Sequence, residues 1–276
     1  MVQAMFARLL LFLSLVTALP AVAQQAVRVP VDGLQLSAQL YRPAVSGRVP
    51  AVAIFHGCGG VGVNNTRMAG LLKEWGYAAL IVDSFGARRM VDVCGRHWPT
   101  QEDADKRLRD IDAALAWLSK QDFVDGSRLA FIGYSYGGGV ALLRAFEPRE
   151  PRARAAILLY PDCGLGAPLI ASQGAMPEPR QPTMFAMGAL DDWTPPAQCQ
   201  ALIDRVKVGK KLIETHVYAD AHHSFDALGL PVRYLDGVGN RSKPGGCCGA
   251  HYGANEAAWK AFVADTRAFL AAALGP

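Results

Sequence analysis

Short runs of β-branched and aliphatic residues alternate along the chain with longer amphipathic stretches. Seven of the short runs predict β-strands, at residues 36–41, 51–55, 78–82, 129–132, 156–160, 183–187 and 212–218. Several of them are apolar throughout rather than alternating, which is typical of strands buried on both faces of a parallel sheet. We therefore expect a central sheet whose strands are mostly parallel.

The stretches between the strands carry the i, i+3, i+4, i+7 spacing of amphipathic helices. The clearest stripes are Met68, Leu71, Leu72 and Trp75, then Leu108, Ile111, Leu115 and Leu118, and near the C-terminus Trp259, Phe262, Val263, Thr266, Phe269 and Leu270. Alternating strands and helices predict an α/β fold with helices on both faces of the sheet. Ligands bind such sheets at the carboxyl ends of the strands, so we look there for chemistry.

The N-terminal 23 residues have the pattern of a secretory signal peptide. Arg8 leads into an apolar stretch without ionisable side chains, and Ala21 and Ala23 supply the small residues of a cleavage site. The stretch is shorter than the roughly 20 residues that a membrane-spanning helix needs. We expect cleavage after Ala23, a secreted or periplasmic protein without stable membrane insertion, and one domain over residues 24–276.

Composition excludes several classes of protein. The chain has 276 residues and a formal net charge of +4, and its basic residues are mixed with acids. It lacks the clustered basic face that binds nucleic acid and the Gly-Lys-Ser/Thr ending of a phosphate loop. Cys247, Cys248 and His251 cluster near His222 and His223, but their spacing matches none of the usual zinc patterns, and neighbouring cysteines rarely bind one ion. We therefore expect no metal and no cofactor, and a small-molecule partner.

A serine stands in the pattern G-x-S-x-G, at residues 133–137. A predicted strand precedes it and an apolar helical run follows it. Such a sharp turn lifts the hydroxyl of Ser135 away from the sheet, and side chains two positions to either side would collide, so glycine occupies both. A glycine-rich turn with an incidental serine is the alternative, but the strand–turn–helix setting favours a nucleophile.

A serine nucleophile needs a base and an acid that orients the base. The strand at 183–187 is followed by Asp191 and Asp192, and the strand at 212–218 is followed by His222 and His223. Each position therefore offers two candidates, in the chain order Ser, acid, His.

Six segments together resemble the dienelactone hydrolase family of α/β-hydrolases, over essentially all of the chain after the leader. They are residues 56–60 (HGCGG), 83–88 (DSFGAR), 133–137 (GYSYG), 160–163 (YPDC), 188–195 (GALDDWTP) and 221–225 (AHHSF). The resemblance implies an α/β-hydrolase fold and a hydrolytic reaction. The family's G-x-x-D-x-x-x-P pattern selects Asp191 over Asp192 as the acid, and its H-x-F pattern selects His223 over His222 as the base.

The resemblance also points to an oxyanion hole. Two backbone N–H groups usually form it, one of them from the residue after the nucleophile, which is Tyr136. The His-Gly segment implies Cys58 as the other, through its main chain, and implies a structural role for His56 in shaping its turn. The name-giving enzymes of the family carry cysteine at the elbow, whereas this chain has Ser135. That departure favours ordinary esters over dienelactone as substrates.

Six cysteines remain after cleavage, an even number that suits an oxidising compartment. With the fold in place, four of them fall near strand ends on the side of the predicted site. We expect Cys58 to pair with Cys94 and Cys163 with Cys199. The last two are adjacent in sequence and form a vicinal pair or bond elsewhere.

Residues of the substrate pocket can be predicted only from their nearness in sequence to the predicted catalytic residues and strand ends. Trp193 flanks the predicted acid, and Arg88 lies in a strand-end loop, where it either binds a substrate carboxylate or pairs with Asp83 or Asp92. Residues 226–255 form a long stretch of glycine, proline and mixed charge, which is typical of a lid or pocket rim.

These features predict an exported serine hydrolase that cleaves a carboxylic ester through an acyl-enzyme intermediate. An amide or peptide hydrolase with the same three residues is one alternative. A catalytically silent binding module on the same scaffold is the other.

Overall fold

A computed structural model describes residues 24–95 and 100–275 of the chain. The predicted signal peptide lies outside the described residues. No helix in the described part of the chain is both long and apolar enough to cross a membrane.

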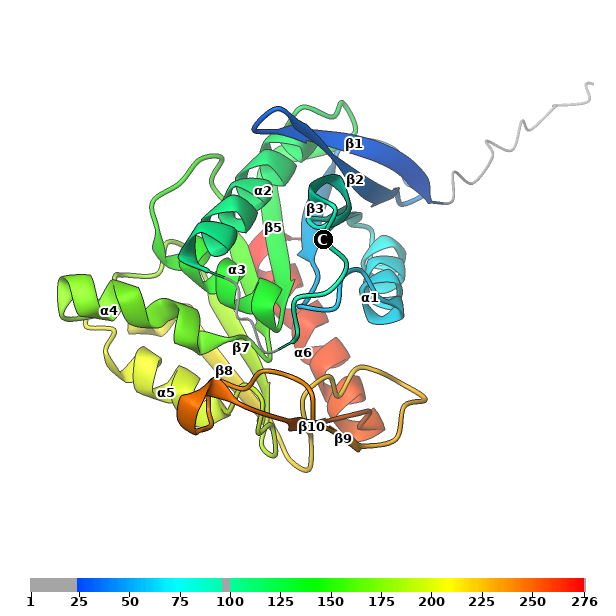
Figure 1. Cartoon of the computed structure of the whole chain (residues 1–276). Helices are drawn as coiled ribbons and strands as arrows, with labels where there is room; N and C mark the ends of the chain where they lie inside the picture. The colour runs from blue at the N-terminus through cyan, green and yellow to red at the C-terminus, as the bar shows by residue number, and fades with distance from the viewer. Residues whose placement is uncertain (1–23, 96–99, 276) are drawn as a thin grey trace, which may run out of the picture.

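Eight strands form one twisted sheet in the order β1-β2-β4-β3-β5-β6-β7-β8 (Figure 1). Strand β1 pairs antiparallel with β2, and β2 pairs antiparallel with β4, while all other neighbours are parallel. The strands are β1 (Gln25–Val31), β2 (Leu34–Tyr41), β3 (Val49–Phe55), β4 (Ala78–Asp83), β5 (Val124–Tyr134), β6 (Ala155–Leu159), β7 (Thr183–Gly188) and β8 (Ile213–Tyr218). The predicted α/β-hydrolase fold, with a mostly parallel sheet, is confirmed.

Strand β1 was not among the predicted strands. Of its seven residues only Val29 and Val31 are buried, because β1 is an edge strand whose other side chains face solvent. Two buried valines give too short an apolar pattern to stand out in the sequence.

Helices cover both faces of the sheet (Figure 1). Helices α1 and α6 pack into the apolar core of one face, and α2, α3 and α5 contribute to the core of the other. The helices are α1 (Val63–Glu74), α2 (Gln101–Ser119), α3 (Tyr136–Phe146), α4 (Ala167–Gln173), α5 (Pro196–Asp204) and α6 (Glu256–Leu274).

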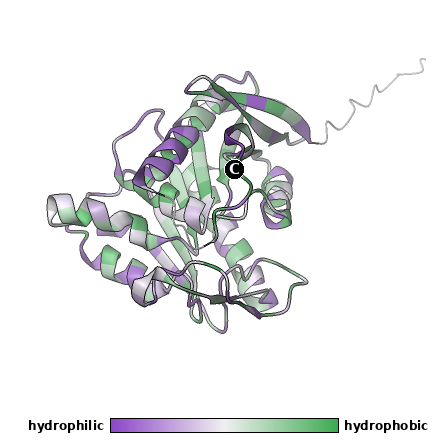
Figure 2. Cartoon of the chain, viewed as in Figure 1, coloured by the Kyte–Doolittle hydropathy of each residue, from purple (hydrophilic) through white to green (hydrophobic). Residues whose placement is uncertain are grey.

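Strand β3 shows why its sequence is apolar throughout. Ala51, Ala53 and Phe55 belong to the core beneath α2 and α3, whereas Val52 and Ile54 belong to the core beneath α1 and α6. In Figure 2 the hydrophobic central strands are covered by helices that carry hydrophilic residues as well. The prediction of strands buried on both faces is confirmed.

Residues 226–255 are not irregular throughout, contrary to expectation. They contain a two-stranded antiparallel sheet of β9 (Arg233–Leu235) and β10 (Ala250–Tyr252). Two strands of three residues each are too short to give a recognisable periodicity.

Both predicted inter-loop disulfides, Cys58–Cys94 and Cys163–Cys199, are present. The remaining two cysteines, Cys247 and Cys248, are bonded to each other. Because Cys247 and Cys248 are bonded to each other, neither is available as a thiolate ligand for a metal ion.

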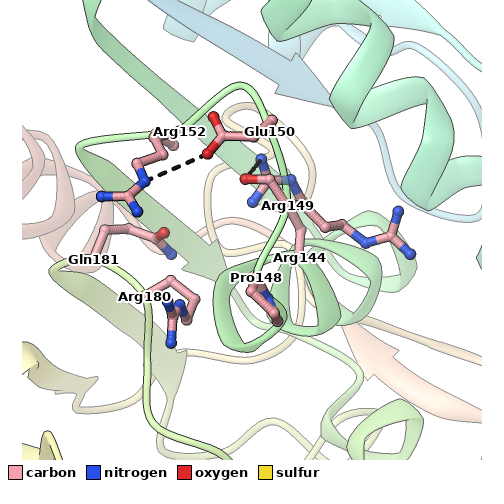
Figure 3. A pocket seen from close by; sticks show the side chains of 8 residues that line it. Arg144, Pro148, Arg149, Glu150, Arg152, Arg180 and Gln181 are labelled. Atoms are coloured by element: carbon pink, nitrogen blue, oxygen red, sulfur yellow. Dashed lines mark hydrogen bonds and ion pairs between the residues drawn. The ribbon is translucent and has the colours of Figure 1, made fainter.

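An arginine-lined cavity of about 170 Å³ is formed by residues that include those just preceding β6 and β7. It therefore lies at the amino ends of these strands, whereas the candidate site lies at the carboxyl ends. Figure 3 shows Arg144, Arg149 and Arg152 at this cavity. The buried Arg144 guanidinium donates to Asp112 at 2.6 Å and to the carbonyl oxygen of Pro151 at 2.7 Å. It therefore ties α2 and α3 to the loop that enters β6.

We expect Arg144→Met to lower the free energy of unfolding by about 1–3 kcal/mol, because it removes the hydrogen bonds of a buried guanidinium, while the partly exposed Asp112 keeps its ion pair with Arg149. The matched control is Arg152→Met. Arg152 lines the same cavity, but its pair with Glu150 is exposed on both sides, so the loss should stay below about 0.5 kcal/mol. Urea titrations of both variants measure the difference, and equal losses would contradict this assignment.

Candidate active site

Ser135 occupies the turn between β5 and α3 in a strained backbone conformation, with φ 53° and ψ −118°. A Cβ atom on Gly133 would lie 2.6 Å from the Cβ of Ala141, and one on Gly137 would lie 2.7 Å from the carbonyl oxygen of Phe55. Neither approach is sterically possible, so both flanking positions require glycine. The turn therefore has the geometry expected of a nucleophile elbow.

The structure brings Ser135, His223 and Asp191 into one hydrogen-bonded row. Oγ of Ser135 lies 2.9 Å from Nε2 of His223, and Nδ1 of that histidine lies 2.8 Å from Oδ2 of Asp191. All three side chains are buried, with Ser135 the most exposed at 9%. They follow β5, β8 and β7, which lie close together in the sheet. This is the arrangement that lets a histidine accept a proton from a serine.

The carboxylate of Asp191 is held in place by its own loop. The backbone N–H groups of Trp193 and Thr194 each donate to Oδ1 at 2.9 Å, which leaves Oδ2 facing His223. The hydroxyl of Thr194 lies 3.0 Å from Oδ2. Thr194 was not among the predicted site residues, although it stands in the family-like segment at residues 188–195.

The two alternative candidates point elsewhere. Oδ1 of Asp192 accepts from the backbone N–H of His251 at 2.7 Å, and Oδ2 lies 2.8 Å from Nδ1 of the same residue. Burial raises the pKa of Asp192, but the hydrogen bonds from His251 outweigh it and the net pKa is lowered. Nδ1 of His222 lies 3.0 Å from the carbonyl oxygen of Leu190. Asp192 and His222 thus support the loops beside the site, and neither joins the row.

His56 lies beneath the site and is fully buried. The backbone N–H of Ser84 donates to its Nε2 at 3.1 Å, so the ring proton sits on Nδ1, 2.7 Å from the carbonyl oxygen of Gly57. Burial, reinforced by the nearby Arg107 guanidinium, lowers the pKa of His56 to about 3. The neutral ring therefore connects two strand-end loops.

This pKa predicts a pH-dependent stability. His56 stays neutral in the folded chain but protonates near pH 6.5 once unfolded, so its contribution is complete above pH 6.5 and is lost as pH falls toward 3. The slope is about 1.4 kcal/mol per pH unit. We expect His56→Gln, which keeps an acceptor for Ser84, to remove that part of the slope. Denaturant unfolding between pH 7 and 4 measures it, and parallel curves for the two proteins would rule it out.

The two residues predicted for an oxyanion hole both line a cavity with Ser135. Tyr136 is the first residue of α3, where a backbone N–H has no partner within the helix. Cys58 is fixed by its disulfide to Cys94 and by its carbonyl oxygen, which accepts from Val93 at 2.9 Å.

Of the predicted pocket residues, Trp193 lies at the site and Arg88 does not. The ring centroid of Trp193 lies 4.8 Å from that of His223, and its indole N–H donates to the carbonyl oxygen of Gly239 at 2.8 Å. Arg88 makes two hydrogen bonds to the buried carboxylate of Asp110, at 2.8 and 2.7 Å, and lines neither cavity beside Ser135.

This corrects both earlier interpretations of Arg88. Its partner is Asp110 of α2, not Asp83 or Asp92, and its guanidinium is engaged away from the site. A pairing between a loop and a distant helix has no signature in the sequence. The arginine beside the candidate site is Arg241, in the segment that follows the base.

The candidate metal ligands are otherwise engaged. The two adjacent cysteines bond to each other, and His251 binds Asp192. Within the described ranges, no cluster of three histidine, cysteine, aspartate or glutamate side chains has a geometry that suits a metal ion.

Ser135 lines two cavities. The wider one, of about 250 Å³, is lined by His223, Asn64, Ser224 and Tyr252 among others. The narrower one, of about 20 Å³, is lined by Tyr136, Asp162 and Arg241 among others. Trp193, Cys58 and Cys94 line both cavities.

A mostly parallel eight-stranded sheet, covered by helices on both faces and carrying a serine at a strand–helix turn, defines an α/β-hydrolase. The family model described as "Dienelactone hydrolase family" matches residues 36–270, so the chain belongs to this family.

Relatives and solved structures agree with this assignment. The chain is 27% identical to a "Probable 2-oxo-3-(5-oxofuran-2-ylidene)propanoate lactonase" of Bradyrhizobium, over 74% of this chain and 84% of that protein. It is 26% identical to a carboxymethylenebutenolidase of Pseudomonas putida, over 70% of this chain and 82% of the relative. A crystal structure of dienelactone hydrolase from Anabaena variabilis has the same fold, with a TM-score of 0.61 and 20% identity over 91% of this chain and 98% of that one.

Proposed function

We propose that this protein hydrolyses a carboxylic ester, open-chain or lactone, through an acyl-enzyme on Ser135. The observation that carries the proposal is the continuous row from Oγ of Ser135 through His223 to Asp191. A binding module has no need of three such groups in this order. Relatives named as a lactonase and a carboxymethylenebutenolidase support an ester bond as the target.

The proposed reaction has two halves. Oγ of Ser135 attacks the ester carbonyl carbon while its proton passes to Nε2 of His223, and Asp191 stabilises the imidazolium that forms. The backbone N–H groups of Cys58 and Tyr136 bind the negative oxygen of the tetrahedral intermediate. His223 then gives the proton to the departing alkoxide, so the alcohol leaves and the acyl group stays on Ser135.

Water completes the cycle. It attacks the acyl carbon, its proton goes to His223, and collapse of the second tetrahedral intermediate returns the proton to Ser135 and frees the acid. With a lactone, the alcohol released in the first half remains tethered to the acyl group. Serine at the elbow needs the full strength of the neighbouring base, because its hydroxyl is a weak nucleophile by itself.

We also propose that the chain acts outside the cytoplasm. Three disulfides support this, since such bonds persist in oxidising compartments. The leader-like pattern of the first 23 residues adds to it.

A fluorophosphonate probe tests the proposed nucleophile. We expect the folded protein to be labelled at Ser135, with labelling lost in His223→Ala and kept in the matched control His222→Ala. Peptide mapping identifies the labelled residue. Labelling elsewhere, or none in a folded protein, would overturn the proposal.

A further inference from the structure

The two cavities beside Ser135 differ in which end of the candidate site they reach. The wide cavity is lined by His223 but not by Tyr136, and the narrow cavity is lined by Tyr136 but not by His223. Both contain Ser135 and Cys58. An open-chain ester bound with its carbonyl carbon at Ser135 can therefore place one half in each cavity.

The proposed chemistry, on which this inference rests, decides which half goes where. The leaving oxygen takes its proton from Nε2 of His223, so the alcohol must lie on the histidine side. That side is the wide cavity. The acyl chain then extends the other way, past the start of α3 into the narrow cavity.

The narrow cavity has room for a very small group. Its volume is about 20 Å³, against about 250 Å³ for the wide cavity. Its walls are fixed, because Cys58–Cys94 is a disulfide and Tyr136 stands against the guanidinium of Arg107, 4.7 Å from the ring centroid.

Part of the lining of the narrow cavity is polar. A guanidinium nitrogen of Arg241 lies 3.7 Å from a carboxylate oxygen of Asp162, and the Asp162 side chain is nearly buried. A longer alkyl chain would have to displace this pair or strip it of solvent, which costs free energy without a compensating hydrogen bond.

The wide cavity offers both polar and apolar contacts. Its volume is about 250 Å³. Its lining includes the polar side chains of Asn64 and Ser224 and the larger, mainly apolar side chains of Trp193, Leu235 and Tyr252. Such a lining suits a bulky alcohol that carries hydroxyl groups on an otherwise apolar frame.

We propose that the preferred substrates of this protein are esters of short acids, acetyl above all, with bulky alcohols. The narrow cavity limits the length of the acyl chain, while the wide cavity admits large alcohols. Val93, which lines only the narrow cavity, is the residue whose size limits the acyl chain.

Two ester series test this in the unmodified mature protein. In the 4-nitrophenyl series, kcat/KM should fall by at least about 10-fold from acetate to butyrate, as expected when methylenes exceed a fixed pocket. Between phenyl acetate and 1-naphthyl acetate, whose leaving groups are similarly acidic, kcat/KM should stay equal or rise.

Two variants locate the selection. Val93→Ala should raise the butyrate-to-acetate ratio of kcat/KM by about 5-fold or more, whereas the matched control Leu235→Ala, in the wide cavity, should leave the ratio unchanged. Equal rates on acetate and butyrate, with Ser135 still labelled by a fluorophosphonate, would overturn the inference alone. No hydrolysis and no labelling would overturn the proposed function, and this inference with it.

Discussion

Ser135→Ala should abolish ester hydrolysis while leaving the fold intact. Its Oγ lies 2.9 Å from Nε2 of His223, and alanine offers no nucleophile to the base. Removing the serine of such a triad lowers kcat by roughly 10⁶-fold. Initial rates with 4-nitrophenyl acetate measure the loss, and circular dichroism and thermal unfolding verify the fold.

Ser84→Ala is the matched control for that experiment. Ser84 follows strand β4 and is buried, and its hydroxyl has no hydrogen-bond partner among the residues that the structure describes. Its contacts to His56 and Arg88 run through the main chain, so alanine preserves them. Activity should stay near that of the unmodified protein. A Ser135→Ala protein that keeps more than about one hundredth of the activity would exclude Ser135 as the nucleophile.

Asp191→Asn should cost about 10⁴-fold in kcat. The carboxylate accepts a hydrogen bond from Nδ1 of His223 and so holds the ring with Nε2 free to take the serine proton. An asparagine amide can donate to Nδ1 instead, which would move the ring proton to Nε2 and block proton transfer. Steady-state kinetics with the same ester measure the effect.

The adjacent aspartate provides the matched control. Asp192 binds His251 and not His223, so Asp192→Asn should keep kcat within about 3-fold and act mainly on stability. If the two substitutions exchanged their effects, Asp192 would be the orienting acid and the assignment of Asp191 would be wrong.

Much of the fold was predictable because a strand that is buried on both faces has an uninterrupted run of apolar residues. Strand β3 is apolar at every position since alternate residues enter different cores. The edge strand β1 and the short β9 and β10 were not predictable, because few of their residues are buried. A pattern of apolar residues records the core of a sheet far better than its margins.

The candidate catalytic positions were predictable for a related reason. The elbow at Ser135 needs glycine at two fixed positions, because a side chain at either would clash with its neighbours. This steric requirement is visible in the sequence as G-x-S-x-G. The order of acid and base followed from strand ends. The choice between adjacent candidates at each end needed the family resemblance, since Asp191 and Asp192 are chemically alike.

Contacts between distant segments could not be predicted. Arg88 reaches Asp110 across 22 positions, and Arg241 reaches the site from a segment whose path the sequence does not specify. The division of the site into a wide and a narrow cavity has the same origin. It depends on how Trp193 and the Cys58–Cys94 disulfide stand in space, and not on any local pattern.

The most direct test of the central claim is to trap the acyl-enzyme. The protein is mixed with excess 4-nitrophenyl acetate, quenched in acid within the first turnovers and analysed by mass spectrometry of its peptides. We predict an acetyl group on the peptide that contains Ser135, at that residue, and none in His223→Ala treated in the same way. Hydrolysis that proceeds with no acetyl group on Ser135, or with the group on another residue, would contradict the account.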